Sequence, residues 1–391
     1  MITYLIKPGE LTLKGGNRKS FESILRRNLT TRLKGSGAHV LTRIGRYYVH
    51  CPPGMEDRVE DALDHLMGIS GWAKTRIAEK NIEAVMAACV EEAKLLQAKG
   101  IKTFKIDGRR TDKSFPYDSY QICCLAGEAV LNQVSGLKVD VRKPECIIEV
   151  EIREKAYVYG MTHAGIQGLP VGTAGKGLVL FSGGIDSPVA AYMMASRGMA
   201  LSAVYFHAYP YTADEAKEKT VKLAQIIARY AQGMSLFVIS FTPIQIRIKE
   251  RAPEAWRTIL LRMAMMHCAE KLALSRGIKC LISGESLSQV ASQTIENISC
   301  TQSRVKIPVL QPLIGMSKEN IIAVAEKIGT YKTSILPYED CCVLFNPPHP
   351  VLKGDPVEAG AFYDALEADA LIEEAINKAE KIYCSFLTQE N

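Results

Sequence analysis

Residues 178–188 read Leu178-Val-Leu-Phe-Ser-Gly-Gly-Ile-Asp-Ser-Pro188, and they say more about the architecture of this 391-residue chain than any other segment. The four apolar residues from Leu178 to Phe181 predict a buried strand. A Gly-rich turn follows, and Pro188 stands where a helix would begin. A strand, a tight turn and a helix N-terminus point backbone N–H groups and the positive end of the helix dipole outward, so this segment is a candidate anion site.

The turn also carries the groups that hold a phosphate. Gly183 and Gly184 would let the backbone approach a ligand closely, and the hydroxyls of Ser182 and Ser187 would donate to it. Asp186 could hold Mg²⁺. The sequence lacks the Gly-Lys-Ser/Thr of the kinase and GTPase P-loop. An ordinary tight turn in an α/β domain is the alternative, but the strand–helix context favours the phosphate site.

Apolar strands and amphipathic helices alternate from residue 178 onward. This alternation predicts an α/β domain with a doubly wound parallel sheet, whose ligands bind beyond the carboxyl ends of the strands. We therefore expect the turn, the pair Tyr205-Phe206 and the triplet Ser283-Gly284-Glu285 to meet at one crevice. The expected strands are 178–181, 201–206, 235–241 and 279–283, and the expected helices are 188–197, 213–232, 254–276 and 318–328.

Two smaller units precede this domain. Residues 1–75 have the pattern of a small α+β unit, and residues 76–165 that of a second α/β unit in which Asn81 caps a helix. The segment 166–177 is rich in glycine and predicts a linker. The last domain then spans 178–391, and Cys384 is expected in a helical tail.

Composition and charge narrow the class of protein. The chain is 47% hydrophobic and 23% charged, typical of a globular protein, and it has neither a signal peptide nor an apolar run of about 20 residues, so we expect a cytoplasmic protein without a membrane span. Its eleven cysteines lack zinc spacing and are expected to be reduced.

The positive charge of the chain is concentrated at its N-terminal end. The net charge is +6, and residues 1–50 alone hold ten Lys or Arg against two Glu. A basic end suits a nucleic-acid backbone, although a solvated surface would read the same.

The quoted turn resembles the PP-loop, SGGxDS, of ATP pyrophosphatases, and further motifs extend the likeness over essentially the whole chain. The chain resembles the tRNA 4-thiouridine synthetase (ThiI) family. The segments that carry the resemblance are Gly9–Arg18, Phe104–Ile106 with Arg110–Pro116, Ser182–Pro188, Gly284–Thr294, Pro312–Lys318 and Leu336–Val343.

The resemblance implies a fold and a set of binding residues. The fold is an N-terminal ferredoxin-like domain, a THUMP RNA-binding domain and a PP-loop ATP pyrophosphatase domain. A histidine would be usual where this chain has Tyr205, Phe206 could instead be core, and Arg262 could instead pair with a carboxylate. The implied ATP-binding residues are Leu180, Phe181, Ser182, Gly183, Gly184, Asp186, Ser187, Tyr205, Phe206, Arg262, Gly284 and Gln293, and the expected tRNA contacts are Arg18, Lys19, Arg26, Arg27, Arg109, Arg110 and Lys113.

The resemblance also implies a reaction. ATP would adenylate O4 of uridine 8 in tRNA, and a cysteine persulfide would then deliver the sulfur of 4-thiouridine. Cys341 aligns with the family's sulfur carrier and Cys342 is the natural resolving thiol, although two buried thiols of no catalytic role are the alternative. Lys318 could touch the RNA or a phosphate, or be a surface lysine. The pair Cys123-Cys124 is expected to be core.

The resemblance also has implications for the partners of the protein. Longer family members carry a rhodanese domain that is not expected here, so the persulfide would come from a cysteine desulfurase. The family also suggests a homodimer and sulfur transfer to the carrier protein of thiamine thiazole synthesis. The competing hypotheses are another PP-loop tRNA-thiolating or amide-forming enzyme, and a non-catalytic RNA-binding protein with an inert ATP fold.

Overall fold

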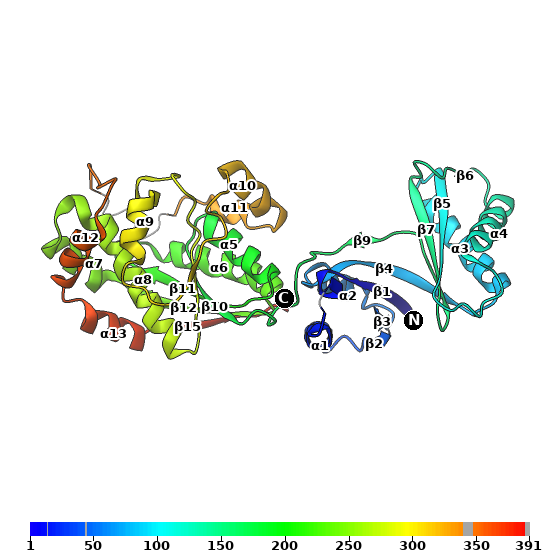
Figure 1. The fold of residues 1–391 in the computed structure, drawn as a ribbon, viewed down its shortest axis with the longest axis horizontal. Helices are drawn as coiled ribbons and strands as arrows, with labels where there is room; N and C mark the ends of the chain where they lie inside the picture. Colours follow the sequence, from blue (N-terminus) through cyan, green and yellow to red (C-terminus); the bar gives the residue numbers. More distant parts are fainter. Residues whose placement is uncertain (14, 44, 339–346, 388–391) are drawn as a thin grey trace. The chain divides into compact units, whose positions relative to one another are not determined.

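The computed structural model describes residues 1–387 except 14, 44 and 339–346. The chain divides into two compact units, Met1–Leu169 and Pro170–Asn391 (Figure 1). Among the described residues, no helix is both long enough and apolar enough to cross a membrane.

The first unit is built on one nine-stranded sheet with the order β2-β3-β1-β4-β8-β7-β5-β6, and β9 also pairs with β4. The long strand β4 belongs to both halves of this sheet, because Thr75 pairs with β1 while Arg76 to Ala78 pair with β8. The expected boundary between residues 75 and 76 therefore falls inside one strand. The strands are β1 (Ile2–Pro8), β2 (His39–Arg43), β3 (Arg46–Cys51), β4 (Ile69–Ala78), β5 (Thr103–Arg110), β6 (Lys138–Val139), β7 (Cys146–Ile152), β8 (Ala156–Tyr159) and β9 (His163–Ala164).

Each half of the sheet has its own helices and its own apolar core. In the N-terminal half, Leu25 and Leu63 from the two helices pack with Tyr4 and Trp72 from the strands. In the second half, the predicted cap Asn81 accepts a hydrogen bond from the N–H of Ala84 at 2.8 Å, satisfying a backbone donor that the first helical turn leaves open. The helices are η1 (Glu10–Leu13), α1 (Arg18–Arg32), α2 (Glu56–Asp64), α3 (Ile82–Ala98) and α4 (Ser119–Gln133).

The second unit is the expected α/β domain. Its six-stranded sheet has the order β14-β13-β10-β11-β12-β15, in which every pairing is parallel except that of β12 with β15. Strand β10 lies between β11 and β13, so the strand order reverses there, which is where such sheets bind ligands. The strands are β10 (Lys176–Leu180), β11 (Ala200–His207), β12 (Met234–Ser240), β13 (Leu281–Ile282), β14 (Val309–Leu310) and β15 (Glu380–Cys384).

Helices cover both faces of this sheet. Side chains of α7, α8, α12 and α13 form one apolar cluster with strand residues such as Leu178, Phe237 and Leu281. Helices α5 and α6 pack on β10, β11 and β12 outside that cluster (Figure 1). The helices are α5 (Asp186–Ser196), α6 (Asp214–Ala231), α7 (Thr242–Arg251), η2 (Glu254–Trp256), α8 (Arg257–Ser275), η3 (Ala291–Gln293), α9 (Ile295–Gln302), α10 (Lys318–Lys327), α11 (Tyr331–Ser334), α12 (Pro356–Asp364) and α13 (Asp369–Asn377).

The expectation of a helical tail around Cys384 was wrong. Residues 380–384 form β15, which pairs antiparallel with β12 from Val238↔Glu380 to Met234↔Cys384. The tail thereby fills the backbone hydrogen bonds of an edge strand that would otherwise be open. Cys384 itself is buried at this edge.

Candidate functional site

A cavity of about 340 Å³ lies at the carboxyl ends of β10, β11 and β13. Ten of the twelve residues expected to bind the nucleotide line this cavity, while Gly183 and Gly184 lie within the turn beside it. Met265 and Met266 were not expected, although they lie one helical turn beyond Arg262 on the same helix. The full lining is Leu180, Phe181, Ser182, Asp186, Ser187, Tyr205, Phe206, Arg262, Met265, Met266, Ser283, Gly284, Glu285 and Gln293.

The Gly-rich turn is shaped by its two serines. The backbone N–H of Ser182 donates to Oγ of Ser187 at 2.9 Å, and the N–H of Gly184 approaches Oγ of Ser182 at 3.3 Å. Helix α5 begins directly afterwards at Asp186, so the N–H groups of its first turn lie beside the cavity. The turn therefore has the geometry of an anion site.

The glycine that the packing of this turn requires is Gly284. A Cβ atom at Gly284 would lie 2.9 Å from the backbone nitrogen of Ser187 and 3.0 Å from Cα of the same residue. At Gly184, a Cβ atom would make only an ordinary contact, 3.4 Å from Oγ of Ser182. Gly284 thus lets the end of β13 pack directly on the turn, a reason different from close approach to a base.

Asp186 is the charged centre of the turn. Nζ of Lys318, at the start of α10, lies 2.7 Å from Oδ1 of Asp186, and Nε2 of Gln289 donates to Oδ2 at 3.0 Å. Three segments far apart in sequence thus meet at one carboxylate. The described residues contain no group of three or more His, Cys, Asp or Glu that could hold a metal ion. Mg²⁺ is commonly bound by one or two carboxylates together with substrate phosphates, and Asp186 fits that arrangement.

The loop that carries Gln289 is held in an unusual conformation. Ser288 adopts a φ of 61°, which lies in the left-handed region that non-glycine residues seldom occupy. Its N–H donates to the carbonyl of Gln293 at 2.9 Å, and Oγ of Ser286 donates to the carbonyl of Met316 at 2.9 Å. Such strain persists only where the surroundings fix it, and it is commonest at functional sites.

Arg262 and Gln293 leave polar atoms unpaired at the opposite wall of the cavity. Arg262 donates to Glu285 through Nη2 and to Oγ of Ser292 through Nη1 at 3.3 Å, while Gln311 donates to Glu285 at 2.5 Å. Nε of Arg262 and Oε1 of Gln293 are buried and have no partner among the described residues. Because buried polar atoms are nearly always hydrogen-bonded, these two atoms indicate a ligand.

The floor of the cavity beside them is apolar. Phe206 is 5% exposed and packs on Phe241 with ring centroids 4.6 Å apart, so it is core as well as cavity wall. Tyr205 is also buried. With Met265 and Met266 they offer a surface on which a flat aromatic ring could pack.

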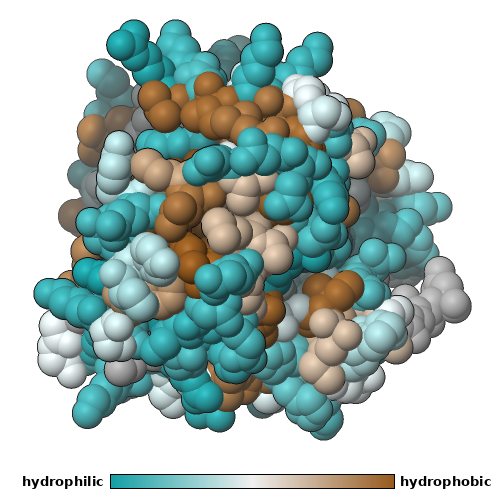
Figure 2. Space-filling view, turned by 90° about the vertical axis from the view of Figure 1, so that its right-hand side faces the viewer, coloured by the Kyte–Doolittle hydropathy of each residue, from teal (hydrophilic) through white to brown (hydrophobic). Residues whose placement is uncertain are grey.

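The basic residues expected to hold RNA lie in the first unit, and their surroundings differ. Lys19, Arg26 and Arg27 on α1 are exposed, as are Arg109 and Lys113. Figure 2 shows one face of the molecule, where hydrophilic side chains surround smaller apolar areas.

Three of these cations have partners within the protein. Arg18 pairs with Glu22 at 2.8 Å and Arg109 with Asp107 at 2.9 Å, so their charges are partly balanced. Nη1 of Arg110 donates to the carbonyl of Phe115 at 2.7 Å. Arg110 therefore shapes the loop that follows β5.

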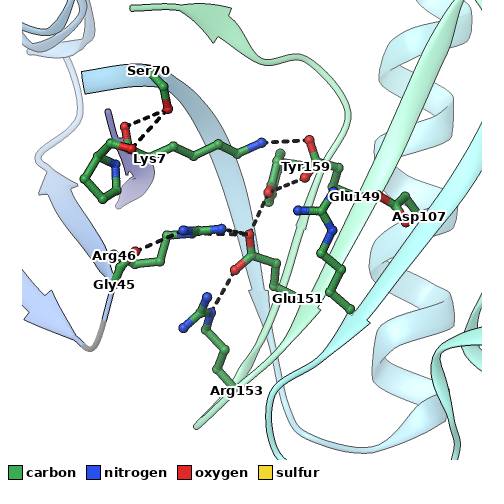
Figure 3. Close-up of polar contacts among 11 residues, drawn as sticks. Lys7, Gly45, Arg46, Ser70, Asp107, Glu149, Glu151, Arg153 and Tyr159 are labelled. Atoms are coloured by element: carbon green, nitrogen blue, oxygen red, sulfur yellow. Dashed lines mark hydrogen bonds and ion pairs between the residues drawn. The ribbon is translucent and has the colours of Figure 1, made fainter. Parts of the chain in front are cut away.

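The two halves of the first unit are joined by a polar network that the sequence did not reveal (Figure 3). Glu151 is 2% exposed and accepts hydrogen bonds from Arg46 at 2.9 Å, Arg153 at 2.7 Å and the hydroxyl of Tyr159 at 2.9 Å. That hydroxyl also lies 2.8 Å from Glu149, which pairs with Lys7 at 2.7 Å. Burial alone would raise the pKa of Glu151, but the two guanidinium groups outweigh it and leave that pKa lowered.

The candidate thiols Cys341 and Cys342 lie outside the described residues, so their predicted role stays a prediction. The nine described cysteines form no disulfide with one another. Burial raises the pKa of Cys89 and of Cys268 to about 12 and that of Cys384 to about 11. These three thiols are thus poor nucleophiles.

Cys123 and Cys124 differ from the core pair that was expected. Cys123 is half-buried and accepts a hydrogen bond from the N–H of Gly108 at 3.1 Å, whereas Cys124 is exposed. The two residues are neighbours on α4, so they point to different sides of the helix.

Known families match this chain along nearly its whole length. The family described as "ThiI ferredoxin-like domain" matches residues 3–73, the THUMP domain matches 79–160, and the family "Thiamine biosynthesis protein (ThiI)" matches 172–367. A "Probable tRNA sulfurtransferase" of Treponema pallidum (strain Nichols) is 46% identical over 99% of this chain and 98% of its own length. One of Caldanaerobacter subterraneus subsp. tengcongensis is 48% identical over 89% of this chain and 91% of its own length.

Solved structures agree with these matches. The crystal structure of a 4-thiouridine synthetase–RNA complex with bound ATP is 32% identical and superposes with a TM-score of 0.91 over 98% of this chain and all of that one. The structure of PH1313 from Pyrococcus horikoshii Ot3 is 25% identical, with a TM-score of 0.67 over 84% of this chain and all of that one. With the three domains in order and full-length relatives above 40% identity, the chain belongs to the ThiI family of tRNA sulfurtransferases.

Proposed function

We propose that this chain uses ATP to adenylate O4 of uridine 8 in tRNA and replaces that oxygen with sulfur, giving 4-thiouridine. The observation that carries the proposal is the cavity at the end of β10. It combines a Gly-rich turn at a helix N-terminus, the Asp186–Lys318 pair and two buried polar atoms that have no partner in the described part of the chain. The similar structure that holds ATP and RNA supports the choice of both substrates.

The cavity suits ATP from end to end. The adenine would lie on the apolar side beside Phe206, where Oε1 of Gln293 could accept from its amino group. The phosphates would lie on the turn and the N-terminus of α5. Mg²⁺, when bound, would neutralise charge on the phosphates, and Asp186 would be its protein ligand. Lys318 would then be released from Asp186 to a phosphate oxygen.

Adenylation makes the uracil oxygen a leaving group. O4 attacks the α-phosphorus, pyrophosphate departs and the N3 proton is lost. The terminal sulfur of a persulfide on Cys341 then bonds to C4 and AMP leaves. Cys342 attacks Sγ of Cys341, which releases the thiocarbonyl and forms a Cys341–Cys342 disulfide that an external dithiol reduces. The raised pKa values of the buried thiols Cys89 and Cys268 support a carrier elsewhere in the chain.

The first unit would hold the tRNA. Lys19, Arg26 and Arg27 are exposed on α1 and Lys113 on the loop after β5, so their charged ends are open to solvent and can meet phosphates. Phosphate contacts of this kind position an RNA without reading its sequence. The proposal therefore expects tRNA affinity to fall steeply with salt, and a flat salt dependence measured by filter binding would contradict it.

The remaining partners are those that the family resemblance implies. A cysteine desulfurase would load the persulfide in the cytoplasm, and the protein would act as a homodimer. The matched family carries the description "Thiamine biosynthesis protein", which supports a second role in passing sulfur to the thiazole carrier protein.

The decisive test is mass spectrometry of nucleosides from tRNA incubated with the protein, ATP, Mg²⁺, a cysteine desulfurase and cysteine. We expect 4-thiouridine with the wild type and with Cys124→Ala, which removes an exposed thiol of the first unit, but none with Cys341→Ala. Cys342→Ser should stop after a single turnover. If this variant turns over repeatedly without added reductant, Cys342 is not the resolving thiol.

A further inference from the structure

A second cavity, of about 300 Å³, lies directly beside the nucleotide cavity. Arg262 lines both cavities, so its side chain forms part of the wall between them. The other walls of the second cavity are largely apolar. They include Ile259, Leu261, Val290, Pro350 and Val351.

The walls of this second cavity are held in place by a buried asparagine. Asn297 is 0% exposed and donates through Nδ2 to the carbonyl of Ala291 at 2.9 Å and to that of Val351 at 2.8 Å. Its Oδ1 accepts from the N–H of Gly354 at 3.0 Å. Both amide protons of Asn297 and one lone pair of its Oδ1 are thus used within the protein, and these bonds fix two sides of the cavity before anything binds.

Two further polar side chains of the cavity, Ser292 and Arg262, can donate to a ligand, and Thr258 also lines it. Ser292 accepts a hydrogen bond from Nη1 of Arg262, so its own hydroxyl proton can be offered to a ligand oxygen. Nε of Arg262 is buried without a partner among the described residues. Glu285, 4% exposed and itself bonded by Gln311, balances the charge of Arg262 and holds the guanidinium at the boundary between the cavities.

We propose that this second cavity receives the uracil ring of the target uridine after the nucleotide is turned out of the tRNA. The inference rests on the proposed function, because O4 must come within bonding distance of the α-phosphorus of ATP. A space that adjoins the nucleotide cavity, with Arg262 in the lining of both, meets that condition. Enzymes that modify a base in folded nucleic acid generally turn it into such a pocket.

The chemistry of the cavity matches uracil. The ring has two carbonyl oxygens that accept hydrogen bonds, and Arg262 and Ser292 are donors. Its two faces are apolar and would pack between the aliphatic side chains of α8 and those near Val351. A purine nucleotide already has the larger neighbouring cavity. Arg262, placed between them, would contact the uracil oxygen and a phosphate at once.

The first experiment uses the product as its own probe. A tRNA carrying 4-thiouridine at position 8 is bound to the wild-type protein with a non-hydrolysable ATP analogue and irradiated with long-wave ultraviolet light. We expect the crosslinked peptides, identified by mass spectrometry, to contain residues 255–262 or 290–297. Crosslinks confined to the segments around Asp186 and Lys318, or to the first unit, or their complete absence from the bound complex, would overturn the proposal.

The second experiment fills the cavity. Ala255→Phe would place a ring in it, and the control Ser299→Phe would place the same ring on the exposed face of α9. For Ala255→Phe we expect the kcat/KM of tRNA thiolation to fall about 100-fold, because a misplaced base no longer reaches the reacting phosphate. Affinities for ATP and for tRNA should stay within about twofold, as for the control.

A gentler variant covers the case in which Ala255→Phe does not fold. Ser292→Ala removes only the hydroxyl, and it should lower kcat/KM about tenfold while ATP affinity is kept, as expected for one lost hydrogen bond. Full thiolation by both variants would sink the proposal. Failure of the wild type to form any 4-thiouridine would instead sink the proposed function, so the two failures can be told apart.

Discussion

Glu151 in the first unit and Arg262 in the second are both charged side chains in largely buried polar clusters, yet their surroundings differ. Glu151 accepts from two guanidinium groups and one hydroxyl, and the network around it closes within the protein. Arg262 has Glu285 and Ser292, but its Nε and the nearby Oε1 of Gln293 lack a partner among the described residues. One cluster is complete and the other is not.

The difference separates polar groups that hold the fold from those that wait for a ligand. A complete buried network contributes to stability, and removing one member leaves the others unpaired. An incomplete cluster lowers stability and persists because something else completes it. We therefore expect substitutions at the junction of the first unit to act on stability, and substitutions in the cavity to act on binding and rate.

The largest effect is expected for Glu151→Ala. It takes away the buried carboxylate that Arg46 and Arg153 share, which costs about 3–5 kcal/mol. Hydrogen exchange of residues 146–159 in the full chain should show the loss of protection, while ATP affinity stays unchanged. Wild-type protection in this variant would mean that the network does not stabilise the junction.

Asp186→Asn should come next, with an effect on rate. It removes the negative charge that the turn presents while keeping the shape of the side chain, and thiolation should fall about 10²–10³-fold, as when one charge-stabilising group is lost from an active site. The melting temperature should barely change, because Lys318 is 39% exposed and can turn to solvent. Asp369→Asn, which alters an exposed ion pair with Lys271, is the matched control and should keep its activity.

Gln293→Leu tests the incomplete cluster most directly. ATP affinity should drop by about 1 kcal/mol, the value of one hydrogen bond. The ligand-free protein should be no less stable, since an unpaired acceptor has been replaced by an apolar group of similar size. Calorimetric titration and a thermal melt measure the two quantities. The control is Gln133→Leu, which makes the same change at an exposed position of α4. A melting temperature of Gln293→Leu far below that of the control would mean that Gln293 already had a partner.

The smallest effect is a pH dependence confined to the first unit. The lowered pKa of Glu151 means that its ion pairs contribute fully above the pKa of an unfolded glutamate, about 4.3, and are lost as pH falls through the folded value. Wild type and Glu151→Gln should therefore differ less in the hydrogen-exchange protection of residues 146–159 below about pH 4. A difference that is constant from pH 7 to pH 3 would assign the effect to shape instead of charge.

The sequence predicted what depends on local pattern. The strand–turn–helix at 178–188, the alternation beyond it and the cap at Asn81 are all written in neighbouring residues, and the structure has them. It did not predict β15, because five residues of mixed polarity form a strand only when the open edge of β12 is beside them. The sequence also did not predict the ion-pair network of Glu151, because its partner Arg46 is 105 residues away.

The two cavities also differ in how far the sequence predicts their linings. Residues on the Gly-rich turn and at strand ends could be listed from motifs, because the carboxyl ends of parallel strands meet at one edge. The lining of the second cavity could not be listed in this way, because its walls come from α8, η3 and the segment after residue 346, which carry no shared motif. The packing reason for Gly284 also depends on the turn at Ser187, nearly one hundred residues earlier.

Strand β4 has a consequence for anyone who wishes to exchange or dissect the parts of this protein. Because Thr75 pairs on one side with β1 and Arg76 pairs on the other with β8, a cut at the border suggested by the two domain patterns would sever hydrogen bonds in both halves at once. A chimera that joins a foreign N-terminal module there would have to supply a matching half-strand. The ferredoxin-like and THUMP parts should therefore be exchanged together, as a single piece.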